Sequence, residues 1–418
     1  MQNRRNAFYI LIIFSLVSGA LSGRAFFFSL SYALGAVLTG SFLWSWAAVN
    51  WLSIARHTHA RRAQVGHSLD ETFRVHNTAL LPKLWLEIRD HSTLPGHNAS
   101  HIVPTLLPRG RFGWETRTIC TRRGEFILGP LTVLSGDPFG LFQFPRKFPA
   151  QSSIIVYPPT VPIHNFAAPV GPLSGGEAVR RRAHFVTTNA AGVRDYQPGD
   201  SFNRIHWRST ARRERTMVKE FELDPLADVW IFLDLSHASL VERPNGAALY
   251  TPLTRLPPST EEYGVTIAAS LAQYFVGKGR ALGFVTYGPY RDIVQPDRGP
   301  RQLTRILEIL ATARSAAELS LAQMLSLETV HLSRGTTAVL ITAAQDERWV
   351  AAAHTLARRG TRIIAVMLDA HSFGAPVPRM HEMQRMAEAA GLVVYTVHQD
   401  DDLTGALSYR GVLRAPAV

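Results

Sequence analysis

Residues 228–235 read Asp-Val-Trp-Ile-Phe-Leu-Asp-Leu, a short and nearly continuous apolar run. Such a run is typical of a strand that is buried on both faces, as in a parallel sheet covered by helices. An antiparallel strand with one wet face would instead alternate apolar and polar residues. The stretch therefore predicts the first strand of an α/β domain.

The chain downstream of this run alternates between strand-like and helix-like patterns. The alternation predicts a mostly parallel sheet with helices on both faces, and residues 290–294 are the candidate for an antiparallel edge strand. Ser259 and Glu262 have the spacing of a capping box at the start of the first helix. The expected helices are 259–277, 301–315, 317–332, one ending at 359 and 380–390, and the expected strands are 281–287, 336–342, 362–368 and 392–397.

The region upstream, from about residue 65 to 160, has a strand-like pattern throughout. Residues 72–77 and 83–90 alternate apolar and polar side chains, and Gly and Pro interrupt the region repeatedly. This pattern predicts a small antiparallel β domain, a sandwich. Cys120 is the one cysteine of the chain, so an internal disulfide and a four-cysteine zinc site are excluded.

Two apolar runs occupy the N-terminal part, at residues 7–23 and 25–55. A spanning helix needs about 20 apolar residues, so the two runs predict a transmembrane hairpin. The basic residues place both of its ends in the cytoplasm by the positive-inside rule, because Arg24 alone lies in the turn. The flanking residues are Arg4, Arg5, Arg56, Arg61 and Arg62. A cleaved signal peptide is the rival interpretation, and it leaves the second run unexplained.

These patterns divide the chain into a multi-domain protein of five parts. They are a transmembrane hairpin (1–60), a β-rich domain (61–165), a linking motif region (166–225), the α/β domain (226–400) and a C-terminal tail (401–418). The net charge of +12 indicates an acidic partner, an anionic membrane or nucleic acid.

A polar motif fills the linking region. Tyr-Gln-Pro-Gly-Asp (196–200) predicts a turn, Asp200 is placed to cap a short helix and to pair with Arg204, and Ile205 and Trp207 are expected to be buried anchors. We interpret the motif first as a structural joint between domains. A recognition surface comes second, and a catalytic centre that uses His206 with Asp195 or Asp200 comes third. The motif residues are Arg194, Asp195, Tyr196, Pro198, Gly199, Asp200, Arg204, His206, Trp207 and Arg208.

Four stretches together resemble the bacterial domain-of-unknown-function family 58. They are Thr-Arg-Arg-Gly-Glu-Phe-Ile-Leu-Gly-Pro-Leu (121–131), Asp-Pro-Phe-Gly-Leu-Phe (137–142), the motif above with Arg-Ile-His-Trp-Arg-Ser-Thr-Ala-Arg-Arg (204–213), and Phe-Leu-Asp-Leu-Ser (232–236) with the helix segment 261–272. The resemblance implies a membrane hairpin, a β region and a von Willebrand factor A-like, Rossmann-like domain. It also implies a MoxR-type AAA+ ATPase as the partner.

The implied fold invites a test for a metal site. Its Mg²⁺ is held by an Asp-x-Ser-x-Ser loop with a distant Thr and Asp, which are the hard oxygen ligands that this ion prefers. Asp234 and Ser236 match, whereas Ala238 stands where the last serine belongs. The strand that should supply the distant carboxylate ends in Thr342 and Ala343. We therefore expect a degenerate site with at most weak Mg²⁺ binding and no other cofactor, in which Asp234 caps the following helix or bonds loop amides.

The stretch 180–219 holds ten Lys or Arg against three Asp or Glu. Solvated or internally paired arginines are the first interpretation, a membrane or an acidic partner the second, and nucleic acid the third, because no nucleic-acid motif accompanies the charges.

The sequence as a whole predicts a non-enzymatic protein-interaction module that is tethered to the bacterial inner membrane. Its soluble domains are expected to face the cytoplasm, and the resemblance implies that it works with the ATPase in envelope-related assembly or stress tolerance. One alternative is a hydrolase or metal-dependent enzyme centred on Asp234 or on Asp195 and His206. A second alternative is a nucleic-acid binder at the membrane.

Overall fold

The computed structural model describes residues 2–166, 190–197, 205–221, 228–242, 256–332, 334–377 and 380–408. The chain divides into two compact units. The first is made of residues Met1–Thr160, Glu242–Ala269 and Thr304–Arg314, and the second of Val161–Val241, Ser270–Leu303 and Ser315–Val418.

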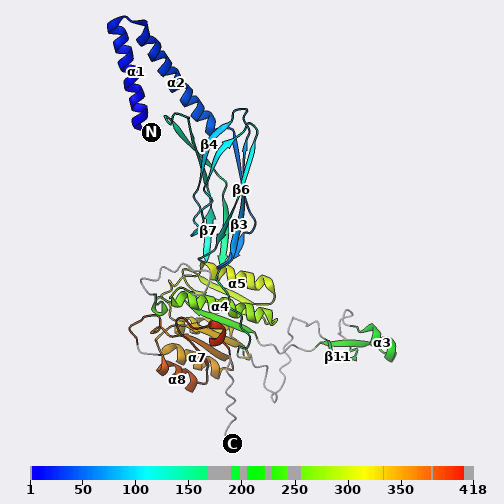
Figure 1. The fold of residues 1–418 in the computed structure, drawn as a ribbon. Helices are drawn as coiled ribbons and strands as arrows, with labels where there is room; N and C mark the ends of the chain where they lie inside the picture. Colours follow the sequence, from blue (N-terminus) through cyan, green and yellow to red (C-terminus); the bar gives the residue numbers. More distant parts are fainter. Residues whose placement is uncertain are drawn as a thin grey trace. The chain divides into compact units, whose positions relative to one another are not determined.

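Two apolar helices begin the first unit, α1 (Gln2–Ser22) and α2 (Ala25–Val49) (Figure 1). Gly23, at a φ of +68°, makes the turn between them, and Ser15 Oγ donates to the carbonyl oxygen of Phe27 at 2.7 Å. Residues Asn3–Ser22 and Ala25–Val49 are each long and apolar enough to cross a bilayer. The predicted pair of apolar N-terminal helices is confirmed, and it fits a membrane protein.

Antiparallel sheets follow the helices, as predicted. Strands β1, β3 and β6 form one sheet, and β5, β4, β8 and β9 form another, with a shared core between them that includes Phe73, Leu86 and Val133. A third sheet, β2-β10-β7, contains one parallel pair, β2 with β10, so the region is not wholly antiparallel. The strands are β1 (Leu52–Thr58), β2 (Arg62–Gln64), β3 (Ser68–Asn77), β4 (Lys83–Asp90), β5 (His101–Leu106), β6 (Arg111–Ile119), β7 (Gly124–Leu128), β8 (Leu131–Gly136), β9 (Gln143–Phe148) and β10 (Ser152–Tyr157).

Strand β1 begins at Leu52, three residues after α2 ends, and pairs with β3 over its whole length. It therefore lies inside the range 1–60 that the sequence assigned to the hairpin. Arg56 of this strand, which the sequence counted as a flank of the membrane span, points into the β domain. Its guanidinium reaches Glu71 at 2.9 Å and Asp90 at 3.2 Å, and all three side chains are at most 2% exposed.

The second unit contains a six-stranded sheet in the order β15-β14-β13-β16-β17-β18. All neighbours are parallel except the edge strand β15, which runs antiparallel to β14, as residues 290–294 predicted. Strands β13, β14 and β16 are buried at every position, which explains their continuous apolar runs. The strands are β13 (Val229–Asp234), β14 (Leu282–Tyr287), β15 (Arg291–Asp297), β16 (Thr337–Thr342), β17 (Arg362–Leu368) and β18 (Val393–Val397).

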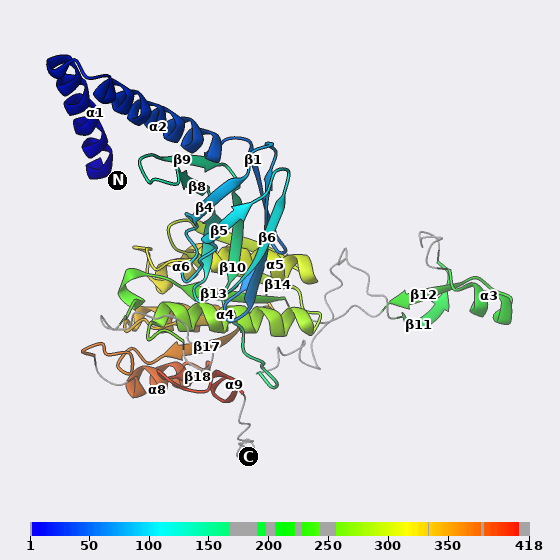
Figure 2. The same cartoon turned by 45° about the horizontal axis from the view of Figure 1, so that its top comes forward.

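Helices cover this sheet, so the predicted α/β region with a parallel sheet is confirmed (Figure 2). Leu325 of α6, Trp349 of α7 and Ala387 of α8 belong to one core cluster with Trp230 and Leu340 of the sheet. Helix α4 lies on the opposite side of the sheet from α7 and buries Phe275 (Figure 1). The helices are α4 (Thr260–Gly277), α5 (Pro300–Thr312), α6 (Leu321–Glu328), α7 (Arg348–Arg358), α8 (His381–Ala389) and α9 (Leu403–Ala406).

The expected tail 401–418 is in part a piece of the fold. Asp402 caps α9 by accepting from the amides of Thr404 and Gly405, and Leu403 and Leu407 are buried. Two apolar side chains in a short polar stretch gave no periodic signal, so the sequence did not reveal this helix. Residues 409–418 lie outside the described part of the chain.

Candidate functional site

The carboxyl ends of β13 and β16 meet at the centre of the second unit. Numbered by position in the chain, the strands of this sheet have the order 3-2-1-4-5-6, and the order reverses between β13 and β16. In doubly wound sheets of this order, ligands bind in the crevice at that point of reversal. The end of β13 is Asp234 and the end of β16 is Thr342, so the sheet brings these two residues to the place where a site is expected.

Asp234 is held by hydrogen bonds on both carboxylate oxygens. Oδ1 accepts from the amide of Ser236 at 3.0 Å, and Oδ2 accepts from the Thr342 hydroxyl at 2.6 Å. The Ser236 hydroxyl donates to Ser239 Oγ at 3.2 Å, and the Ser239 hydroxyl donates to the Ser236 carbonyl at 2.9 Å. Burial raises the pKa of Asp234 above its ordinary value, although bonds from Thr342 and Ser236 act in the opposite direction. These four side chains are called the Asp234 cluster below.

The Asp234 cluster is a poor donor set for a divalent cation. It supplies one carboxylate and three hydroxyls, and each oxygen of Asp234 already accepts a hydrogen bond. Among the residues that the structure describes, no group of three or more His, Cys, Asp or Glu is placed to hold a metal ion. The bond from the Ser236 amide fits the interpretation in which Asp234 orders its own loop.

We expect calorimetric titration of the detergent-solubilised chain with MgCl₂ at pH 7 to show no saturable binding at micromolar concentrations. The reason is that a cation would have to displace the Thr342 hydroxyl from a buried carboxylate whose pKa is raised. Saturable binding that Asp234→Ala abolishes, and that Asp346→Ala leaves unchanged, would show that the cluster is a working metal site. Asp346 is the control because it lies on the surface and pairs with Arg348 at 2.6 Å.

The linking motif forms a small arm, β11 (Ala190–Asp195), α3 (Trp207–Arg213) and β12 (Met217–Phe221), with β11 and β12 antiparallel (Figure 2). Asp195 pairs with Arg215 at 3.2 Å, and both side chains are more than half exposed. His206 caps α3, with Nδ1 at 2.7 Å from Ser209 Oγ. These contacts give His206 and Asp195 separate structural roles. Pro198, Gly199, Asp200 and Arg204, with the expected Asp200–Arg204 pair, lie outside the described residues.

Ile205 and Trp207 differ in the exposure of their side chains. Ile205 is 7% exposed and bridges Val218 of β12, so its predicted burial is confirmed. Trp207 is 70% exposed, so its predicted burial is wrong. The physical reason is the change from extended chain to helix at residue 206, which turns the next side chains away from the strand pair. Tyr196 donates its amide to the Thr216 carbonyl, and Arg208 is exposed on α3.

Two further constellations in the structure had no signal in the sequence. Arg123, from the stretch 121–131, lies within 3.1 Å of Glu261 and Glu262, which open the stretch 261–272. Glu328, fully buried on α6, accepts from Tyr287 and from Arg291. Such pairs join residues that are far apart in the sequence. Arg123 and the two glutamates lie in two of the four stretches that resemble the family, but the sequence did not indicate that these stretches are in contact.

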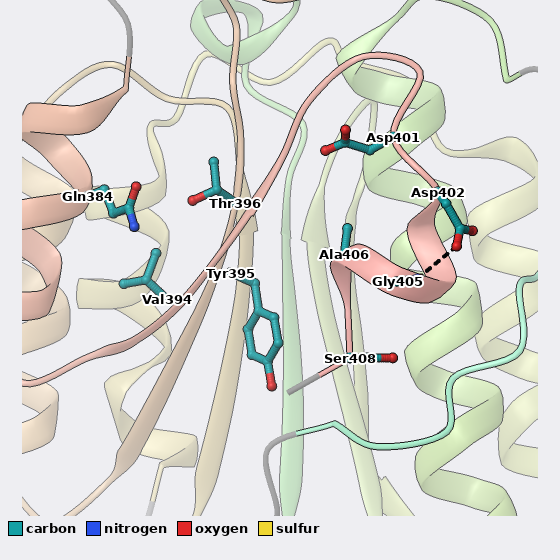
Figure 3. A pocket seen from close by; sticks show the side chains of 9 residues that line it. All are labelled: Gln384, Val394, Tyr395, Thr396, Asp401, Asp402, Gly405, Ala406 and Ser408. Atoms are coloured by element: carbon teal, nitrogen blue, oxygen red, sulfur yellow. Dashed lines mark hydrogen bonds between the residues drawn. The ribbon is translucent and has the colours of Figure 1, made fainter. Parts of the chain in front are cut away.

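An open pocket of about 570 Å³ lies beside the edge strand β18 and α9 (Figure 3). Its acidic residues Asp401 and Asp402 follow the strand, and Asp402 accepts from the Gly405 amide at 3.1 Å. Strand β17 separates β18 from β16, so the pocket is distinct from the Asp234 cluster. It is lined by Gln384, Val394, Tyr395, Thr396, Asp401, Asp402, Gly405, Ala406 and Ser408.

Comparisons with known proteins point to one family. Residues 192–377, which include part of the arm and the Asp234 cluster, match the family model described as "Protein of unknown function DUF58". A Bacillus subtilis (strain 168) protein, "Uncharacterized protein YeaD", is 26% identical over 201 residues, which are 47% of this chain and 44% of that protein. The chain therefore spans less than half the length of this curated relative.

The solved structures described below identify neither a fold nor a function for this chain. The CARDB domain of the PF1109 protein from Pyrococcus furiosus matches with a TM-score of 0.19 and 11% identity, over 25% of this chain and 86% of that one. The C-terminal domain of wzt matches with a TM-score of 0.20 and 6% identity, over 25% of this chain and 73% of that one. Both scores are too low to identify a fold. Over residues 192–377 the chain is similar to the family described as DUF58.

Proposed function

We propose that the protein is a membrane-tethered interaction module and an adaptor for a MoxR-type AAA+ ATPase in envelope-related assembly or stress tolerance. The soluble parts face the cytoplasm of a bacterial cell, with the hairpin in the inner membrane. The apolar helices α1 and α2 and the basic residues that flank them support this placement. The choice of this ATPase as the partner rests on the family resemblance of the sequence.

The α/β region is, in this proposal, a von Willebrand factor A-like domain. Its support is the Rossmann-like strand order with an antiparallel edge strand, and Asp234, Ser236 and Thr342 at the point where the order reverses. Because the Asp234 cluster is a poor donor set for a cation, this von Willebrand factor A-like domain would bind protein without a resident cation.

The observation that carries the proposed function is the exposed surface of the arm. Trp207 is 70% exposed on α3, and Arg208, Arg212 and Arg213 are exposed on the same helix. Tryptophan and arginine are the residues most enriched among those that dominate binding energy in protein interfaces. A large apolar ring amid arginines fits a partner surface that combines an apolar pocket with carboxylates.

The enzymatic alternatives have less support. His206 is engaged as the cap of α3, and Asp195 pairs with Arg215, so neither contact resembles an acid–base pair poised on a substrate. The Asp234 cluster contains hydroxyls around a buried carboxylate. The Ser236 hydroxyl donates to another hydroxyl, Ser239 Oγ, and not to a base of the kind that activates a serine nucleophile.

We expect Trp207→Ala to weaken binding of the immobilised MoxR-type ATPase about 30-fold, the effect of losing about 2 kcal/mol at a hot spot. The measurement is the Kd of the detergent-solubilised full chain by biolayer interferometry, with ATP present. Tyr290→Ala is the matched control, because Tyr290 is an aromatic side chain that is 79% exposed on the turn between β14 and β15. Equal affinities of the two variants would contradict the arm as the binding surface, and a wild-type chain that does not bind would contradict the partner.

A further inference from the structure

The end of α2 is embedded in the β domain. The Phe42 ring makes edge contacts with Phe142 and Phe144 of the β8–β9 hairpin, at 5.6 and 5.4 Å between centroids. Ser45 is fully buried and donates to the Phe142 carbonyl at 3.1 Å. The last two turns of a membrane-spanning helix are thus in direct contact with this hairpin.

A second set of loops meets the chain just after α2. The amide and the hydroxyl of Thr78 both donate to the Trp51 carbonyl at 2.8 Å. Lys83 donates to the Ala47 carbonyl and lies 5.6 Å from the Trp51 ring, so a cation covers the negative end of the helix dipole. Asn77 Nδ2 donates to the carbonyls of Leu81 and Leu107, which ties the β3–β4 and β5–β6 loops together.

The length of α2 fixes the depth of these contacts. Its 25 residues make a helix of about 37 Å, whereas the hydrocarbon core of a bilayer is about 30 Å thick. The helix is therefore about 7 Å longer than the core is thick, which leaves room for about one turn among the lipid headgroups. Trp46 and Trp51, in edge contact at 5.3 Å, have the position of an interfacial aromatic belt. Loops bonded to this turn must lie at the same depth.

The tips of these loops are apolar and exposed. Leu80 is 73% exposed, Leu81 50%, Leu107 67% and Phe139 59%. The turn that carries Phe139 is rigid, because Asp137 accepts from the amides of Phe139 and Phe142 at 2.9 and 2.7 Å. Figure 1 shows the loops at this end of β4 and β6 level with the last turns of α2.

We propose that the tips of the β3–β4, β5–β6 and β8–β9 loops insert into the headgroup–acyl boundary of the phospholipid bilayer beside α2. The occupant of this surface is lipid, because the surface continues the face of a spanning helix and lies at interfacial depth. Arg109 and Arg111, exposed beside Leu107, add attraction to anionic headgroups. In this proposal the stretch Asp-Pro-Phe-Gly-Leu-Phe (137–142) packs against the end of α2 and places Phe139 in the membrane.

The test is fluorescence quenching of the full chain in liposomes of phosphatidylethanolamine and phosphatidylglycerol. Cysteines at Leu107→Cys or Phe139→Cys carry an NBD label, and nitroxide-labelled phospholipids quench it. We expect both labels to lose more than about half of their fluorescence, as side chains buried in the headgroup region do. The native Cys120 gives little background, because it is fully buried and burial raises the pKa of its thiol to about 11. All variants nevertheless carry Cys120→Ala.

The control is Ile119→Cys, at the opposite end of β6 from Leu107. Ile119 is 41% exposed, and the nine residues of β6 separate it from the tip by about 30 Å. Its label should keep its fluorescence when nitroxide lipid is added. Labels at 107 and 139 that stay unquenched and water-exposed would overturn the proposal. A blue-shifted emission without quenching at these two positions would also overturn it, because it would show that a protein, and not lipid, covers the labels.

Discussion

Arg56→Ala is expected to lower the free energy of unfolding of the first unit by about 5 kcal/mol, the upper end of the range for a broken buried ion pair. The guanidinium lies between Glu71 and Asp90, bonds Ser92 Oγ at 3.0 Å and covers the Phe73 ring at 5.0 Å. Both carboxylates are at most 2% exposed, so neither can recover its lost partner from water.

The loss should depend on pH in a defined direction. Burial alone would raise the pKa of Asp90, but bonds from His97 and Ser92 and the charge of Arg56 hold it below its ordinary value. A carboxyl with a lowered pKa stabilises the fold above its unfolded pKa of about 4, and that contribution disappears as pH falls through the lower folded value. The difference between the wild type and Arg56→Ala should therefore be largest at neutral pH and shrink below about pH 4.

Urea unfolding of the detergent-solubilised chain, followed by circular dichroism at pH 7 and pH 3.5, measures this effect. Arg89→Ala is the matched control, because Arg89 lies on β4 next to Asp90 but is 52% exposed and pairs with Glu87 on the surface. Its midpoint should not change. If the midpoints of Arg56→Ala and Arg89→Ala coincide, the network around Arg56 contributes no net stability.

Arg123→Ala is expected to cost about 3 kcal/mol, the lower end of the same range. The Arg123 side chain has no exposed surface, and its Nη2 donates to Glu261 at 2.6 Å and to the Ala313 carbonyl at 2.7 Å. Its Nη1 lies 3.1 Å from Glu262. The cost is smaller than for Arg56 because Glu261 is 13% exposed and keeps Arg314 at 3.6 Å.

The same urea titration at pH 7 tests Arg123, with Arg117→Ala as its control. Arg117 is 74% exposed and pairs with Asp70 on the surface of the same β domain, so its removal should leave the midpoint unchanged. An Arg123→Ala midpoint equal to that of Arg117→Ala would refute a structural role for the stretch 121–131. Restored stability in Arg123→Lys would show that charge, more than the planar fork of hydrogen bonds, is what Glu261 and Glu262 require.

The sequence by itself determined most elements of the α/β region and their order. Residues 362–368 form β17 with the predicted bounds, and the antiparallel edge strand predicted at 290–294 is β15, which begins at Arg291 and runs to Asp297. The N-terminal apolar runs are helices long enough to span a bilayer. These features follow from periodicity and from the length of apolar runs, which are local properties that a stretch of chain carries with it.

Only the tertiary structure decided which residues meet and which face water. Asp234 and Thr342 are brought together because β13 and β16 are neighbours, although 108 positions separate them. Arg123 finds Glu261 across 138 positions. Trp207 is exposed although the sequence predicted a buried anchor, because the direction of a side chain depends on the elements packed around it. Pairing between distant strands and contacts between distant side chains depend on how the whole chain folds, which a local pattern does not encode.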